Sequence, residues 1–99
     1  MNDFHAIAKA LADPQRFEIF EMVSNAGELS CGDIAARCPI SQATVSHHLK
    51  VLQDVGLLSV RRQGQRHIFS ANTDVLDGYL RELKARTTPG QRAALSPAS

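Results

Sequence analysis

Cysteine, tryptophan and long hydrophobic runs are scarce or absent in this sequence of 99 residues, which has two cysteines and no tryptophan. No apolar stretch approaches the roughly 20 residues that a membrane-spanning helix needs. The first residues also lack the basic region and apolar core of a signal peptide, so we expect neither a leader nor a membrane anchor. Two cysteines in such a chain are typical of free thiols in a reducing compartment. The sequence therefore predicts a cytoplasmic protein.

Net charge is also low, at +1, and by itself predicts no partner. Its distribution along the chain is uneven. Residues 1–40 carry three basic and six acidic side chains (−3), residues 41–72 carry four and one (+3), and residues 73–99 carry four and three (+1). Positive charge gathered in one segment is typical of a surface that meets a polyanion.

Hydrophobic spacing and capping residues predict four helices in the first half of the chain. Asp13-Pro14 has the form of an N-cap followed by proline at the first helical position. Ser30 with Asp33 has the form of a capping box. The expected helices run over about 3–12, from Pro14 to the stop signal Asn25-Ala26-Gly27, from Ser30 to Pro39, and over about 42–54 between Ser41 and Gly56.

After the fourth helix the hydrophobic pattern changes from helical to alternating. Residues 58–62 and 67–70 have the period of strands, and Gln63-Gly64-Gln65 between them has the composition of a hairpin turn. This segment therefore predicts a two-stranded β-hairpin.

The rest of the chain predicts a fifth helix and a tail. Apolar residues recur at helical spacing over about 73–86, whereas residues 87–99 are rich in Pro, Gly, Ser and Ala, which is typical of disorder. We expect one domain over residues 1–86 and a disordered tail over 87–99. The fold class of the domain is mainly α with a two-stranded β-hairpin.

The third and fourth helices, joined by a tight turn, predict a helix-turn-helix. The fourth would be the recognition helix, because one side is apolar (Val45, Leu49, Leu52) and the opposite side is polar or basic. The polar side presents Gln42, Thr44, Ser46, His47 and Lys50. Small polar residues near a helix N-terminus can approach base edges and phosphates in a major groove.

The hairpin is basic as well. Arg61, Arg62 and Arg66 flank the glycine turn, so the hairpin can act as a wing on the adjacent DNA backbone or minor groove. Four helices, of which the third and fourth form a helix-turn-helix, are followed by a hairpin wing and a last helix, and this order predicts a winged helix.

Three motifs together resemble the ArsR (SmtB/ArsR) family of bacterial winged-helix repressors: Leu11-Ala-Asp-Pro-Gln-Arg16, the stretch SQATVSHHLKVLQDVGLL and the wing RRQGQRHIFS. The resemblance covers about residues 6–72. It implies a homodimer that places each fourth helix in the major groove of a palindromic operator upstream of its own operon. Together with the basic residues above, the expected DNA contacts are Gln42, Ala43, Thr44, Ser46, His47, Lys50, Arg61, Arg62, Gln63, Gly64, Gln65 and Arg66.

The first and last helices have apolar faces that a domain of this size does not readily cover. We expect them to form the dimer interface, as the resemblance implies; the alternative is that both pack onto their own domain. The expected interface residues are Phe4, Ile7, Leu11, Val75, Leu76, Tyr79, Leu80 and Leu83.

The four histidines do not predict a metal site. His47 and His48 are adjacent on a helix and so point about 100° apart. We expect one of the two to face DNA and the other to lie at the edge of the core. His5 and His67 have no partner at ligand spacing.

The resemblance implies two possible inducer sites, and this sequence lacks the ligands of both. A Cys-x-Cys pair would lie at the start of the third helix, where Ser30 and Gly32 stand with Cys31 between them. An Asp/His site would lie on the last helix, which has no histidine. We therefore expect no metal or cofactor, and the inducer is left open.

The two cysteines remain as candidates for a thiol sensor. Seven residues apart on one helix, Cys31 and Cys38 would be separated by about 10 Å, whereas a disulfide needs Cα atoms within about 7 Å. We expect Cys38 to pack as a small hydrophobe. Cys31 is the better candidate because a helix N-terminus favours the thiolate. Pro39, where relatives more often have glycine, leaves the geometry of the turn open.

Two other classes of function compete with a DNA-binding repressor. A winged-helix module that binds proteins would present an apolar or acidic recognition face, which this sequence does not predict. An enzyme is not expected, because Ser46 and His47 lack a third orienting group and an oxyanion loop.

Overall fold

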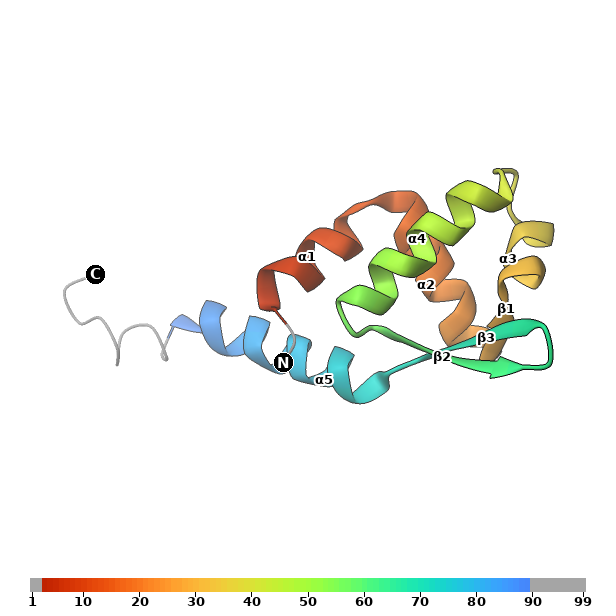
Figure 1. The fold of residues 1–99 in the computed structure, drawn as a ribbon. Coiled ribbons are helices and arrows are strands. Elements are labelled where there is room, and N and C mark those ends of the chain that lie inside the picture. The colour runs from red at the N-terminus through yellow and green to blue at the C-terminus, as the bar shows by residue number, and fades with distance from the viewer. Residues whose placement is uncertain (1–2, 90–99) are drawn as a thin grey trace.

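The computed structural model describes residues 3–89, which form five helices and three strands (Figure 1). Most of the expected disordered tail, residues 90–99, lies outside the described residues. The last helix continues to Thr87, one residue beyond the predicted end. The elements are α1 (Phe4–Ala12), α2 (Pro14–Ala26), β1 (Glu28–Ser30), α3 (Cys31–Arg37), α4 (Gln42–Asp54), β2 (Leu58–Gln63), β3 (Arg66–Ala71) and α5 (Thr73–Thr87).

Local capping chemistry sets the helix boundaries, as the sequence predicts. Asp13 accepts a hydrogen bond from the backbone of Arg16, and Pro14 occupies the first turn of α2. Ser30 and Asp33 form a reciprocal capping box at α3, since each side chain accepts from the other residue's backbone N–H at 3.0 Å. Ser41 caps α4. These side chains satisfy backbone groups that the first helical turn leaves unpaired.

The sheet has three strands, so the expected two-stranded hairpin is incomplete. β1 pairs antiparallel with β3, which gives the order β1-β3-β2. Leu29 lies opposite Phe69, and Phe69 lies opposite Val60. The sequence did not reveal β1 because a three-residue strand is too short to show alternation, and its last residue also caps α3.

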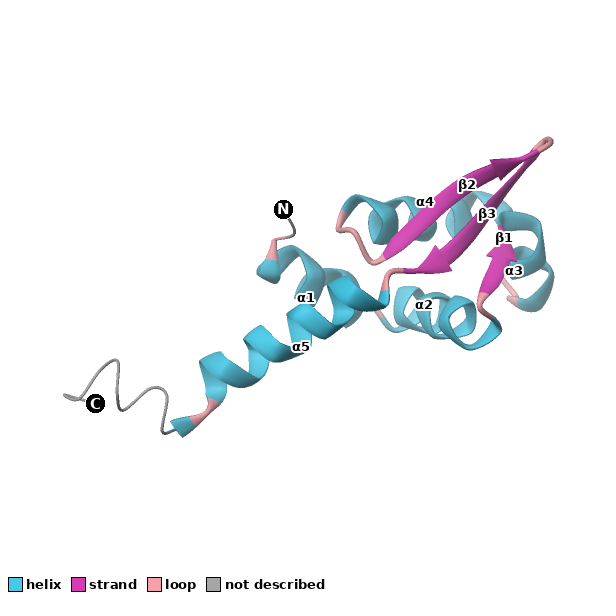
Figure 2. Cartoon of the chain, turned by 90° about the horizontal axis from the view of Figure 1, so that it is seen from below, coloured by secondary structure: helices cyan, strands magenta, loops and turns pink. Residues whose placement is uncertain are grey.

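Apolar side chains from α2, α3, α4 and the sheet form one core. α2 and α4 both pack against the sheet, while α3 lies across α4 (Figures 1 and 2). The largest fully buried side chains are Ile19, Val23, Ile34, Val45, Leu49, Leu52, Leu57 and Leu58. This core fixes α4 from behind, which leaves its other side at the surface.

α5 is the exception to this packing. It contacts α1 and extends away from the rest of the domain (Figure 2). None of its residues is buried, and Leu80 and Leu83 are 50% and 38% exposed. α1 therefore covers only part of α5, and exposed leucines of this kind are typical of a surface that binds a partner.

Candidate nucleic-acid interface

α4 separates buried and exposed residues as expected. Val45, Leu49 and Leu52 are at most 1% exposed. The opposite side, which we call the recognition front, is exposed at every position: Gln42, Ala43, Thr44, Ser46, His47 and Lys50. It carries no acidic residue, so the positive end of the helix faces solvent without a carboxylate.

The two adjacent histidines of α4 have different surroundings, as predicted. His47 is exposed, whereas His48 is 6% exposed. His48 Nε2 lies 2.9 Å from Gln15 Oε1, and its Nδ1 lies 3.4 Å from Arg16 Nη1. Burial lowers the pKa of His48; Asp13 opposes this shift, and Arg16 and His47 add to it.

The residues expected to form the wing are exposed, from Arg61 to Arg66. Gly64 has φ +64° at the first of two loop positions, a conformation that glycine adopts without strain. In the three-stranded sheet, β1 and α3 bring carboxylates to two of the three wing arginines. Sequence reasoning missed both contacts because it missed β1.

The first of these contacts joins β2 to β1. Arg61 Nη2 donates to Glu28 Oε1 at 2.8 Å, and its Nη1 donates to Gln63 Oε1 at the same distance. The second contact joins β3 to α3. Arg66 Nη2 donates to Asp33 Oδ2 at 3.1 Å and to Ser30 Oγ at 3.0 Å. Arg62 makes no ion pair with any residue of 3–89.

A groove of about 310 Å³ lies between the recognition front and β3. Cys31 lies in it, with Sγ 3.3 Å from Ser46 Oγ. His67, which appeared isolated in the sequence, also lines this groove. The full lining is Cys31, Gln42, Ser46, Leu49, Lys50, Gln53, His67 and Phe69. The fold therefore places a thiol and an imidazole beside the expected DNA-binding surface.

The other cysteine packs against the core. Cys38 is half-buried at the end of α3, and both cysteines are free thiols. Burial raises the pKa of the Cys38 thiol, and Glu18 adds to the shift. The turn at Pro39 contains no residue with positive φ, so it needs no glycine. Within the described residues, no group of three or more His, Cys, Asp or Glu is placed to hold a metal ion.

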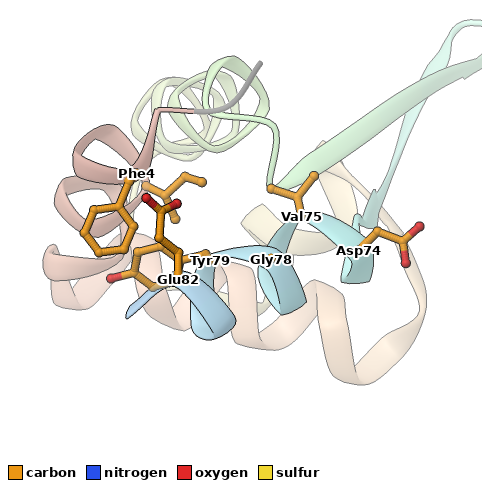
Figure 3. Close-up of a pocket in the computed structure, with 7 residues that line it drawn as sticks. Phe4, Asp74, Val75, Gly78, Tyr79 and Glu82 are labelled. Carbon is orange, nitrogen blue, oxygen red and sulfur yellow. The ribbon is translucent and has the colours of Figure 1, made fainter. Parts of the chain in front are cut away.

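Four of the expected dimer residues line the place where α1 meets α5: Phe4, Ile7, Val75 and Tyr79. The Phe4 and Tyr79 rings are 5.1 Å apart, and the Arg86 guanidinium lies 4.3 Å from the Phe4 ring centre. A cavity of about 420 Å³ opens here (Figure 3), lined by Phe4, Ile7, Asp74, Val75, Gly78, Tyr79 and Glu82. Ile7 is only 2% exposed, so it supports this surface from beneath rather than forming part of it.

Comparisons with known proteins agree with this geometry. A family model described as "Helix-turn-helix domain" matches residues 11–61. The arsenical resistance operon repressor of Staphylococcus xylosus is 36% identical over 93% of this chain and 88% of its own length.

None of the helices in residues 3–89 has the length and hydrophobicity that crossing a membrane requires.

Solved structures resemble this fold closely. An ArsR-like transcriptional regulator from Rhodococcus sp. RHA1 superimposes with a TM-score of 0.81 at 25% identity, covering 94% of this chain and 87% of that one. The homodimeric winged helix-turn-helix DNA-binding domain of Mb0332 from Mycobacterium bovis gives 0.69 at 28% identity, covering 86% and 80%. The chain belongs to the ArsR family of winged helix-turn-helix regulators.

Proposed function

We propose that this protein is a sequence-specific DNA-binding transcriptional repressor that reads its operator through the recognition front of α4. The observation that carries the proposal is the division of this helix. Its apolar side is locked in the core, and its exposed side is polar, small and free of acidic residues. The relative in S. xylosus is named an operon repressor.

The side chains of the recognition front have the chemistry that base readout requires. An amide such as that of Gln42 can bind adenine through two hydrogen bonds, and the hydroxyls of Thr44 and Ser46 can donate or accept. Lys50 is 3.5 Å from Asp54, but both side chains are more than 60% exposed. Exposed pairs of this kind are weak, so Lys50 can exchange Asp54 for a DNA phosphate.

The wing would hold the DNA backbone beside the recognition front. Arg62 is the arginine best placed for this contact, because no carboxylate of residues 3–89 pairs with it. Arg61 and Arg66 must first exchange their carboxylates for phosphates. Backbone contacts of this kind fix register and add affinity that does not depend on sequence.

The active form would be a cytoplasmic homodimer joined through α1 and α5. The exposed leucines of α5 and the cavity beside Phe4 support this arrangement, and the M. bovis neighbour is described as homodimeric. A two-fold axis would present two recognition fronts to half-sites about 34 Å apart on one face of the duplex. The matching operator is a palindrome. We propose no catalytic activity.

The proposal is tested by DNA binding at several salt concentrations. A duplex selected from a random pool serves as operator, and anisotropy gives the affinity of the full chain between 50 and about 300 mM salt. We expect log K to fall linearly with log salt, by about 0.9 for each phosphate contact. A flat response would instead support the module that binds proteins.

A pair of variants localises this binding. Ser46→Glu adds a carboxylate to the recognition front, whereas Asn25→Glu adds the same charge to the exposed side of α2. We expect the first change to abolish operator binding and the second to leave it unaltered. Equal effects of the two variants would show that the front is not the binding surface.

A second property, a thiol- or metalloid-responsive release of DNA, is favoured by one contact. The Cys31 sulfur lies 3.3 Å from Ser46 Oγ, so a group attached to it would occupy space beside the recognition front. Alkylating the thiol with iodoacetamide should release the operator from the native chain but not from Cys31→Ser. Arsenite and peroxide can be compared in the same assay. Equal release of the operator from the native chain and from Cys31→Ser would exclude Cys31 as the sensor.

A further inference from the structure

His48 joins the recognition helix to the start of α2. Its ring points away from the recognition front, is 6% exposed, and uses both nitrogens. Gln15 Oε1 can only accept a hydrogen bond, so Nε2 carries the proton and donates at 2.9 Å. Nδ1 then keeps its lone pair and accepts from Arg16 Nη1 at 3.4 Å. This arrangement requires a neutral ring.

Arg16 extends the connection from α4 to the end of α1. Its Nε donates to the carbonyl of Ala10 at 2.8 Å, and its Nη2 lies 3.4 Å from the carbonyl of Lys9. Asp13 accepts from the Arg16 backbone at 3.0 Å. One guanidinium thus touches the last turn of α1 and the imidazole of α4. Because α1 belongs to the proposed dimer interface, this contact links that interface to the recognition helix.

A second proton on His48 would break the connection. Protonated Nδ1 becomes a donor and would face a guanidinium that has only donors, at a distance where two positive charges repel. The charged and titratable groups that act on the ring are Arg16 and Asp13 from α2 and His47 from α4. Only Asp13 would attract a charged ring, and it is already engaged with Arg16.

We propose that His48 is a positioning residue for DNA recognition: its neutral ring holds α4 against the α1–α2 junction, and its protonation weakens operator binding. The inference rests on the proposed function. Burial, Arg16 and His47 keep the pKa of His48 below the usual 6.5, so the holding form prevails at neutral pH. The contact is lost progressively as the pH falls below this value.

The test compares operator affinity at pH 7.5 and at pH 5.5, at constant ionic strength, for the native chain and for His48→Gln. Glutamine keeps a donor for Gln15 but cannot titrate in this range. We expect the native chain to lose affinity relative to the variant by up to about tenfold, since the ratio of protonated to neutral ring changes tenfold per pH unit. Melting curves at pH 7.5 establish that the variant is folded. His48→Asn, which keeps an acceptor for Arg16, replaces it if it is not.

The adjacent histidine is the matched control. His47 is exposed on the recognition front and takes no part in the hydrogen bonds of His48. His47→Gln should therefore keep the pH-dependent loss of operator affinity that His48→Gln removes. If His48 had only a structural role, His48→Gln would change operator affinity by the same factor at pH 7.5 and at pH 5.5.

The outcomes separate this inference from the proposed function. The same pH dependence in the native chain and His48→Gln would overturn the positioning role, and so would a gain by the native chain relative to that variant at pH 5.5. Absence of operator binding by the native chain at every pH would overturn the proposed function, and this inference with it.

Discussion

At the scale of single residues, Ser30 holds three segments together. It is 5% exposed, and its hydroxyl accepts from the Asp33 backbone and from Arg66, both at 3.0 Å. The short helix α3 begins at this cap, and the guanidinium on β3 is fixed by it. Loss of the hydroxyl would leave a helix N–H and an arginine without this acceptor.

Ser30→Ala should lower the free energy of unfolding by about 1–2 kcal/mol, because a cap and a buried hydrogen bond are lost together. Urea denaturation measures this change. Ser24→Ala is the matched control, since Ser24 lies within α2 and bonds only its own helix at Phe20. We expect a change of less than about 0.5 kcal/mol there, as alanine favours helices. Equal losses would show that the cap contributes nothing special.

The pH dependence of stability should have two separate ranges. Because the folded protein favours neutral His48, the unfolded chain binds more protons below pH 6.5, and stability falls as the pH decreases through this range. Asp13 and Asp33 affect stability at lower pH. Backbone hydrogen bonds hold the pKa values of both carboxyl groups below 3.8, so their contribution to stability is lost only as the pH falls beneath that value.

His48→Gln should therefore flatten the stability curve between pH 7 and 5 and leave the acid loss below about pH 4 in place. Thermal melting at fixed protein concentration distinguishes the two ranges. An unaltered slope between pH 7 and 5 in the variant would contradict the assignment to His48.

Residue contacts close in sequence were predictable, and distant ones were not. The helix caps contact backbone within three residues, so the local sequence pattern predicts them. They are Asp13-Pro14, the Ser30–Asp33 box and Ser41. His48 lies 32 and 33 residues from its two partners, and Arg61 lies 33 residues from Glu28. No periodicity encodes such pairs.

At the scale of elements, the wing contains arginines in two states. Arg62 has no carboxylate partner in residues 3–89, whereas Arg61 is held by Glu28 at 2.8 Å. The three wing arginines, Arg61, Arg62 and Arg66, therefore should not contribute alike to DNA binding. Sequence alone suggested three equivalent arginines.

Arg62→Ala should weaken binding to operator and random duplex alike and reduce the salt slope by about one unit. Arg61→Ala should reduce the slope less, because Glu28 already neutralises much of that charge. Titrations at several salt concentrations measure both slopes. A loss confined to the operator would mean that Arg62 reads bases rather than phosphates.

The limits of prediction were different for each element. The period of apolar residues fixed α4 over 42–54, which is where the structure has it. β1 was not predicted because three residues are too few to show an alternating hydrophobic pattern. Only their pairing with β3 makes them a strand. The exposed side of α4 could be predicted because the helical period alone decides which residues share a side. The carboxylates that pair with the wing arginines depend on how the strands pair, which the sequence does not show.

At the scale of the whole molecule, the exposed leucines of α5 favour association with a second copy. The helix has no buried residue, and although it contacts α1, its Leu80 and Leu83 remain exposed. A small domain that leaves such a helix uncovered gains stability by association. The family resemblance implies a homodimer, and the apolar period of the helix predicts which side would face the partner.

Leu80→Lys and Leu83→Lys should each raise the dimer dissociation constant about tenfold or more. Burying a leucine is worth roughly 1.5–3 kcal/mol, and 1.4 kcal/mol corresponds to a factor of ten. Sedimentation velocity measures the equilibrium, and Asn25→Lys on the exposed side of α2 is the control. Dimers of normal stability in both leucine variants would place the interface elsewhere.

We expect one surface, the recognition front together with wing residues 62–66, to meet DNA. Amide chemical shifts of the labelled full chain, followed by NMR as the selected operator duplex is added, test it most directly. We predict that the largest changes fall on residues 42–47 and 62–66, with smaller ones on α1 and α5. The largest changes on α1 and α5, or none on the recognition front at saturating DNA, would contradict the account.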